Sequence, residues 1–145
     1  IRYKGRTDLM LALMDEGTVA AGVTTKSKTC SAPVLWCREQ LAHGRARALV
    51  VNSGNANACT GDEGLQNARI MCADVAELVG CAPEEVLVAS TGVIGVPLPM
   101  EKVRAGIRAA FAELATGAEA GRARGGPCRG RDRTRARRGR RSARR

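Results

Sequence analysis

The sequence predicts a layered α/β fold, and three observations support this class. Short apolar runs rich in β-branched residues alternate with longer segments of helical periodicity, in the order strand, strand, helix, strand, helix, strand, helix. The chain has 145 residues and is 44% hydrophobic, which is enough for one globular domain with a buried core. Only 2% of the residues are aromatic, so we expect aliphatic side chains to build that core.

The amino-terminal part is predicted to hold two strands and a helix. Residues 8–14 form a short apolar run, and residues 17–25 alternate weakly and end in β-branched residues, so both are expected to be strands. Ser31 is a suitable N-cap for a helix over residues 32–42, which Gly44 would end. The apolar face of this helix would consist of Val34, Cys37 or Arg38, and Leu41.

The following segments predict alternating strands and helices. Residues 46–52 indicate a buried strand, residues 53–61 a loop, and residues 61–79 a long helix. A strand is predicted over residues 86–89, and Pro99 is typical of the start of a last helix. The apolar stripe of that helix is predicted to pack in the core and consists of Met100, Val103, Ile107, Ala110, Phe111 and Leu114.

The charge is divided unevenly along the chain. The net charge is +10, yet residues 121–145 carry twelve Arg and one Asp, which leaves residues 1–120 at −1. We therefore expect a globular domain over residues 1–120 and an arginine-rich tail over residues 121–145 that is disordered or out of frame. A basic arm for nucleic-acid phosphates and an inert solvated tail are the alternatives. A frameshift is favoured, because 21 of the 25 tail residues are Arg, Gly, Ala or Pro, whose codons are GC-rich.

The cysteines and the lone histidine do not predict a metal or redox centre. No pair is spaced as C-x-x-C, so we expect no metal site and mostly buried, reduced thiols in a cytoplasmic protein. A Cys–His nucleophile would have to use His43, in an expected loop, and is disfavoured. No apolar stretch approaches the roughly 20 residues of a membrane span. Without an initiator Met, the chain is expected to start inside a longer protein.

Two loops rich in Asn, Ser, Thr and Gly follow two of the predicted strands. Neither contains a phosphate-binding glycine motif or a pair of residues suited to general-base catalysis. In "VASTGVIG", Thr91 and Gly92 stand at the end of the strand, where a hydroxyl and a backbone N–H could stabilise an oxyanion. Taken alone, this Thr-Gly pair is more typical of an ordinary turn.

Two long segments resemble a known family. "ARALVVNSGNANACTGDEGLQNAR" (46–69) and "PEEVLVASTGVIGVPLPMEKV" (83–103) closely resemble the ornithine acetyltransferases, the bifunctional glutamate N-acetyltransferases of the ArgJ family. The similarity covers residues 1–117. The resemblance implies that family's stacked α/β layers, which are similar to N-terminal-nucleophile hydrolases and are completed by a second, β chain.

The resemblance also implies an enzyme and its mechanism. Members cleave themselves at an Ala-Thr bond, and the new amino-terminal Thr carries acetyl from N-acetylornithine to glutamate in arginine biosynthesis. The motif places the oxyanion hole at Thr91 and Gly92. No cofactor is expected; acetyl-CoA, a donor for some members, is left open. The α and β chains usually form a heterotetramer.

The sequence departs from the family where the nucleophile would be expected. The cleavage motif is absent, and Ala115-Thr116 lacks its flanking residues, so no nucleophile is assigned in this chain. No substrate-binding residue is assigned either. We expect a truncated α-chain part, inactive by itself, with exposed apolar surface and unpaired strand edges that favour aggregation. A nucleic-acid-binding module with a basic tail is the alternative function.

Overall fold

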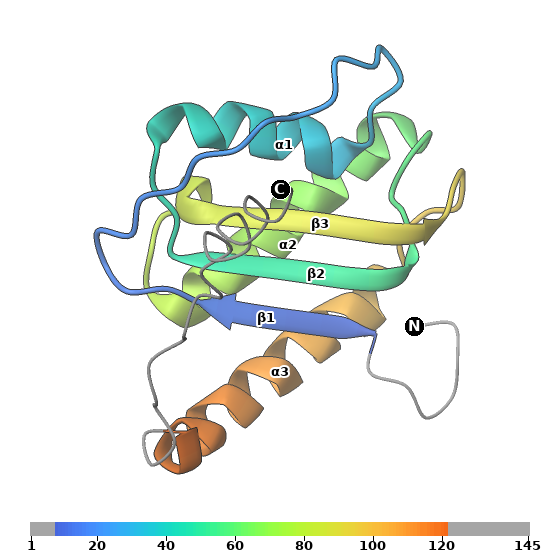
Figure 1. The fold of residues 1–145 in the computed structure, drawn as a ribbon. Helices are drawn as coiled ribbons and strands as arrows, with labels where there is room; N and C mark the ends of the chain where they lie inside the picture. Colours follow the sequence, from blue (N-terminus) through green and yellow to red (C-terminus); the bar gives the residue numbers. More distant parts are fainter. Residues whose placement is uncertain (1–7, 122–145) are drawn as a thin grey trace, which may run out of the picture.

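Three strands and three α-helices form a layered α/β structure (Figure 1), which confirms the predicted fold class. The computed structural model describes residues 8–121, with the backbone alone for residues 115–121. The tail predicted over residues 121–145 therefore lies, apart from its first residue, outside the described part. The elements are β1 (Leu9–Leu13), α1 (Ala32–Gln40), η1 (Leu41–His43), β2 (Ala48–Asn55), α2 (Gly61–Val79), η2 (Pro83–Glu85), β3 (Val86–Val93) and α3 (Met100–Gly121).

The strands form one sheet in the order β1-β2-β3. β1 is antiparallel to β2, with Leu11 opposite Val50, whereas β2 and β3 are parallel, with Val50 opposite Val88. A parallel pair needs a crossover connection, and α2 supplies it. Consequently the carboxyl ends of β2 and β3 lie at the same edge of the sheet, and the polar loops that follow them meet there.

One face of the sheet is covered by helices and contains the core. α2 packs against β2 and β3, and α3 packs against β1 and α2. The core is almost entirely aliphatic, as predicted, and the apolar stripe of α3 contributes to it through the fully buried Val103 and Ile107. A bidentate ion pair joins Arg104 of α3 to Asp74 of α2 at 2.7 and 2.9 Å.

The opposite face carries no helix of the described residues (Figure 1). Residues that alternate with the core positions point to this side, and they include Met10, Leu49, Val51 and Leu87. Met10 is 50% exposed, and the other three are only partly buried. Part of the exposed apolar surface expected from the sequence therefore lies on this sheet face, and other exposed apolar side chains, such as Val23 and Ile94, lie in loops.

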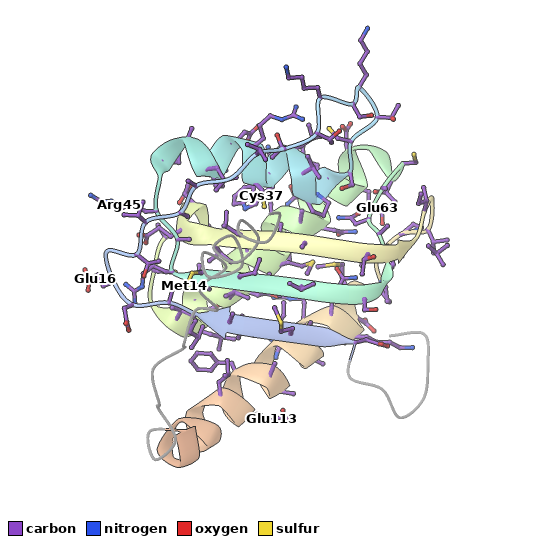
Figure 2. The ribbon with its side chains drawn as sticks, viewed as in Figure 1. Met14, Glu16, Cys37, Arg45, Glu63 and Glu113 are labelled. Atoms are coloured by element: carbon purple, nitrogen blue, oxygen red, sulfur yellow. The ribbon has the colours of Figure 1, made fainter. Side chains whose placement is uncertain are left out.

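α1 lies along the outer edge of β3, and the residues that it buries differ in part from those predicted. Trp36 Nε1 donates to the carbonyl oxygen of Val86 at 2.9 Å. Cys37 lies between α1 and β3 (Figure 2), where its Sγ is 3.1 Å from the carbonyl oxygen and 3.4 Å from the amide nitrogen of Val88. The predicted face was right for Cys37, which packs against the core, but wrong for the rest: Arg38 is exposed, and the fully buried positions are Ala32, Pro33, Trp36 and Gln40.

The strand predicted over residues 17–25 is also wrong. Only a single antiparallel bridge forms there, between Val19 and Arg45, and the remainder is not paired in the sheet. Val19 is 80% exposed and Val23 is fully exposed, so these β-branched side chains cover no apolar surface among residues 8–121. Propensity without burial or a pairing partner does not make a strand.

The other boundaries agree with the prediction except at the ends of two strands. The predicted helix over residues 61–79 is confirmed, and Gly80 ends it in the left-handed conformation with φ +75°. β2 continues to Asn55 and β3 to Val93, beyond the predicted ends at 52 and 89. Within residues 8–121, the helices are too short or too polar to cross a membrane.

Substituting Trp36 with Phe tests the docking of α1. Trp36→Phe removes the hydrogen bond to Val86 and some packing volume, and we expect it to lower the free energy of unfolding by about 1–3 kcal/mol. Glu39→Ala on the exposed side of α1 is the control, with an expected loss of about 0.5 kcal/mol or less. Urea unfolding followed by circular dichroism measures both; equal losses would contradict the docking role of Trp36.

Candidate functional site

The two polar loops predicted to carry the site meet at the carboxyl ends of β2 and β3. The parallel register continues beyond the apolar part of both strands, with Ser53 opposite Thr91 and Gly54 opposite Gly92. A register shift follows at Asn55. Thr91 and Gly92 therefore lie within the last residues of β3, and not in a turn after it.

A buried hydrogen bond joins the two strands just before Thr91. Asn52 of β2 is fully buried, and its Oδ1 accepts from the Ser90 hydroxyl at 2.5 Å. Its Nδ2 donates to the backbone carbonyl of Asn55 at 2.8 Å. Because an unpaired buried amide is costly, this pairing fixes the side chain of Asn52 and the position of Ser90.

Asn55 and Asn57 extend this network into both loops. The side-chain Nδ2 of Asn55 donates to the carbonyl oxygen of Val96 at 2.7 Å, and its Oδ1 accepts from the backbone N–H of Asn57 at 2.8 Å. Asn57 adopts a positive φ of 46°, and its side chain donates to the Gly64 carbonyl at 2.8 Å. The loop after β3 is thereby tied to β2 and to the first turn of α2.

These three asparagines were not assigned a role from the sequence. Asn52, Asn55 and Asn57 are at most 5% exposed. The available signal was the "NSGNAN" segment directly after a buried apolar strand, because repeated Asn residues there indicate side chains that satisfy irregular backbone.

The Thr91 side chain is exposed on the sheet face that lacks helices. It alternates with Ser90, whose hydroxyl points to the helical side, so the two hydroxyls lie on opposite faces. The amide of Val88 faces α1 at the outer edge of β3. By the two-residue alternation of a strand, the N–H of Gly92 belongs to the same outer edge.

Gly92 occupies a position that admits no side chain. Its φ is +133°, which L residues rarely adopt, and a Cβ placed there would collide with the backbone carbonyl carbon of Gly54 and lie 2.5 Å from the amide nitrogen of Asn55. The glycine therefore allows β2 and β3 to approach closely at the point where their register shifts.

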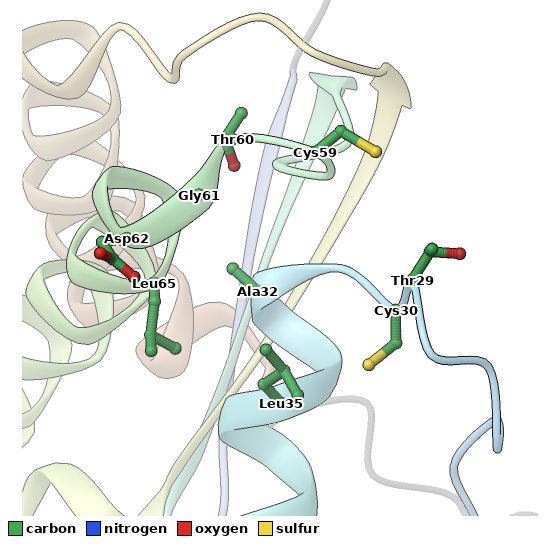
Figure 3. Close-up of a pocket in the computed structure, with 9 residues that line it drawn as sticks. All are labelled: Thr29, Cys30, Ala32, Leu35, Cys59, Thr60, Gly61, Asp62 and Leu65. Atoms are coloured by element: carbon green, nitrogen blue, oxygen red, sulfur yellow. The ribbon is translucent and has the colours of Figure 1, made fainter.

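A cavity of about 400 Å³ lies on the helical side, between the start of α1 and the start of α2 (Figure 3). Neither Thr91 nor Gly92 belongs to its lining, which consists of Thr29, Cys30, Ala32, Leu35, Cys59, Thr60, Gly61, Asp62 and Leu65. The described residues contain no group of three or more His, Cys, Asp or Glu side chains that could hold a metal ion.

The cysteines are less buried than predicted. Of the five in the described part, only Cys72 is buried, three are half-buried, and Cys59 is exposed. Burial and the neighbouring Cys37 raise the pKa of Cys72 strongly. His43 is exposed at the end of η1, and Ala115-Thr116 lies inside α3. The backbone thus places this Ala-Thr pair in a helix.

The fold of this chain is similar to that of solved proteins of the ornithine acetyltransferase class. A crystal structure of ornithine acetyltransferase complexed with ornithine from Mycobacterium tuberculosis aligns with a TM-score of 0.71 and 40% identity, over 73% of this chain and 58% of that chain. The crystal structure of the arginine biosynthesis bifunctional protein ArgJ from Bacillus halodurans gives 0.70 and 41%, over 73% and 56%.

The chain belongs to the ArgJ family, whose sequence profile matches residues 1–125. It is 59% identical over 102 residues to the arginine biosynthesis bifunctional protein ArgJ of Bradyrhizobium diazoefficiens, covering 70% of this chain and 25% of that protein. The ArgJ of Gluconobacter oxydans is 56% identical over 115 residues, which cover 79% and 27%. The chain therefore spans about a quarter of the length of these relatives.

Two glycine substitutions distinguish the cost of a backbone collision at Gly92 from the cost of a positive φ alone. Gly92→Ala is expected to lower the free energy of unfolding by more than about 3 kcal/mol, because it combines a positive φ with a backbone collision. Gly95 also has a positive φ, +77°, but a Cβ built on it would meet no atom within 4 Å, so Gly95→Ala is the control. We expect that control to cost only about 1–2 kcal/mol. Similar losses in thermal or urea unfolding would contradict the collision.

Alkylation tests the burial of the thiols. At about pH 8, iodoacetamide is expected to modify Cys59 fastest among the five described cysteines and Cys72 at least about 100-fold more slowly, because burial keeps Cys72 protonated and inaccessible. Peptide-resolved mass spectrometry gives the order, and the same reaction in urea is the control in which the difference should disappear. Comparable rates for Cys59 and Cys72 without urea would contradict the packing.

Proposed function

We propose that this chain contributes the oxyanion-binding part of an acetyltransferase that moves acetyl from N-acetylornithine to glutamate in arginine biosynthesis. Membership of the ArgJ family supports the reaction, as do the relatives named arginine biosynthesis bifunctional protein and the solved relative complexed with ornithine. The observation that carries the proposal is the geometry of Thr91 and Gly92 at the fixed end of β3.

The chemistry needs two donors at a developing negative charge. When a Thr nucleophile attacks the acetyl carbonyl, the carbonyl oxygen becomes an oxyanion, and ornithine leaves as the amine. The Thr91 hydroxyl, exposed on the open face, and the Gly92 N–H, on the outer edge of β3, would both donate to that oxygen. Glutamate then attacks the acyl-enzyme through the same tetrahedral geometry.

The nucleophile belongs, in this proposal, to a segment that is not among these residues. We infer an amino-terminal Thr released by autocatalytic cleavage, on a β chain that covers the open sheet face near Thr91. A heterotetramer and a cytoplasmic location are further parts of the proposal, which leaves the use of acetyl-CoA open. They follow from the family resemblance.

The alternative of a nucleic-acid-binding module is not supported. It depended only on residues 121–145, which lie outside the described part apart from Gly121. The similar proteins are ArgJ proteins.

A hybrid enzyme tests the role of Thr91. Residues 1–117 would replace the matching quarter of the Bradyrhizobium diazoefficiens ArgJ, and acetyl transfer from N-acetylornithine to glutamate would be measured. Thr91→Ala is expected to lower kcat by about 100-fold, with a smaller change in KM, because the hydroxyl acts mainly in the transition state.

Thr91→Ser, which keeps the hydroxyl, is the matched variant and should retain kcat within about tenfold. Ser27→Ala, in an exposed loop, is the control for a hydroxyl removed far from the site and should leave kcat unchanged. A Thr91→Ala hybrid with unchanged kcat would contradict the proposed oxyanion role.

A further inference from the structure

We infer that Ser90 and Asn52 are positioning residues that hold Thr91 and Gly92 in their working geometry. This inference rests on the proposed function. It starts from the fact that a hydroxyl and a backbone N–H stabilise an oxyanion well only when they are fixed before the reaction. The end of a strand tends to fray, so something must fix it.

The Ser90–Asn52 hydrogen bond acts on the residue directly before Thr91. The Ser90 hydroxyl donates to Asn52 Oδ1 at 2.5 Å, and Asn52 is fully buried. Ser90 is anchored on the helical face, so its neighbour Thr91 must present its side chain on the open face. The alternation that buries Val86 and Val88 places the Thr91 hydroxyl on the open face, and the bond to Asn52 holds the strand end in that orientation.

A second set of contacts holds the segment after Gly92. The amide of Ala56 donates to the carbonyl of Val93 at 2.9 Å, and the amide of Gly95 donates to the carbonyl of Ala58 at 2.8 Å. Asn55 binds the carbonyl of Val96 at 2.7 Å. Thr91 and Gly92 are therefore fixed between an anchor before them and three after them.

Asn52 also links the two sets of contacts. Its Oδ1 accepts from Ser90, and its Nδ2 donates to the carbonyl of Asn55, the residue that reaches the loop after β3. Removal of the Ser90 hydroxyl leaves Oδ1 of Asn52 buried without a hydrogen-bond donor. Because an unpaired buried acceptor is costly, we expect the surrounding backbone to rearrange locally. The effect should therefore reach both proposed donors.

Kinetics of the hybrid enzyme test this inference. Ser90→Ala is expected to lower kcat roughly tenfold while KM stays nearly constant, because small displacements of fixed donors weaken transition-state binding. Ser90→Thr, which keeps the hydroxyl, should restore most of kcat. Val103→Ala in α3 is the control for general destabilisation and should leave kcat unchanged. If Ser90→Ala kept the wild-type kcat while Thr91→Ala lowered it, the positioning role of Ser90 would be overturned and the proposed function would stand.

Amide hydrogen exchange on the 145-residue chain provides a readout independent of activity. Ser90→Ala should speed exchange at Ala56 and Gly95 by roughly tenfold relative to Val103→Ala, since local opening of both loops becomes easier. Ser90→Thr should not. Unchanged exchange would overturn the inference even if Thr91 proves essential. Fast exchange in Ser90→Ala, with no effect of Thr91→Ala on kcat, would instead refute the proposed function and leave the anchor intact.

Discussion

The buried side chain of Asn52 is the contact on which the arrangement of the site depends. Its two amide atoms join β3 to β2 and the middle of β2 to the last residue of that strand, Asn55. Apolar burial holds the strands together only up to Val50 and Val88; beyond these, the register continues through polar and glycine residues that bury little apolar surface. Directional hydrogen bonds, which are costly to leave unpaired, replace hydrophobic packing there.

The position of α1 determines which part of β3 remains accessible. Trp36 and Cys37 occupy the outer edge of β3 at Val86 and Val88, which protects an edge strand from pairing with another chain. Further along β3, Thr91 and Gly92 are both exposed. The outer edge at Gly92 and the open face at Thr91 are therefore available together, and this is the condition for two donors to act on one atom.

Gly92 links the fold to the proposed chemistry. Because Gly92 has no Cβ, the backbone of Gly54 can approach it closely. For the same reason no side chain of residue 92 shields its N–H from a substrate. A Thr-Gly pair is an ordinary turn signal by composition, but here it lies in a strand with a register shift. A structural requirement and a proposed catalytic one thus coincide at one residue.

The sequence alone determined the three strands that form and the three α-helices, the apolar stripe of α3 and the motif that identifies the family, because these depend on local periodicity and residue identity. It failed for residues 17–25 and for the face of α1, since burial there depends on partners far along the chain. The tertiary structure alone placed Asn52 beside Ser90, 38 residues apart, and set the two hydroxyls of β3 on opposite faces. Only the parallel register, formed through the crossover helix, brings those groups together.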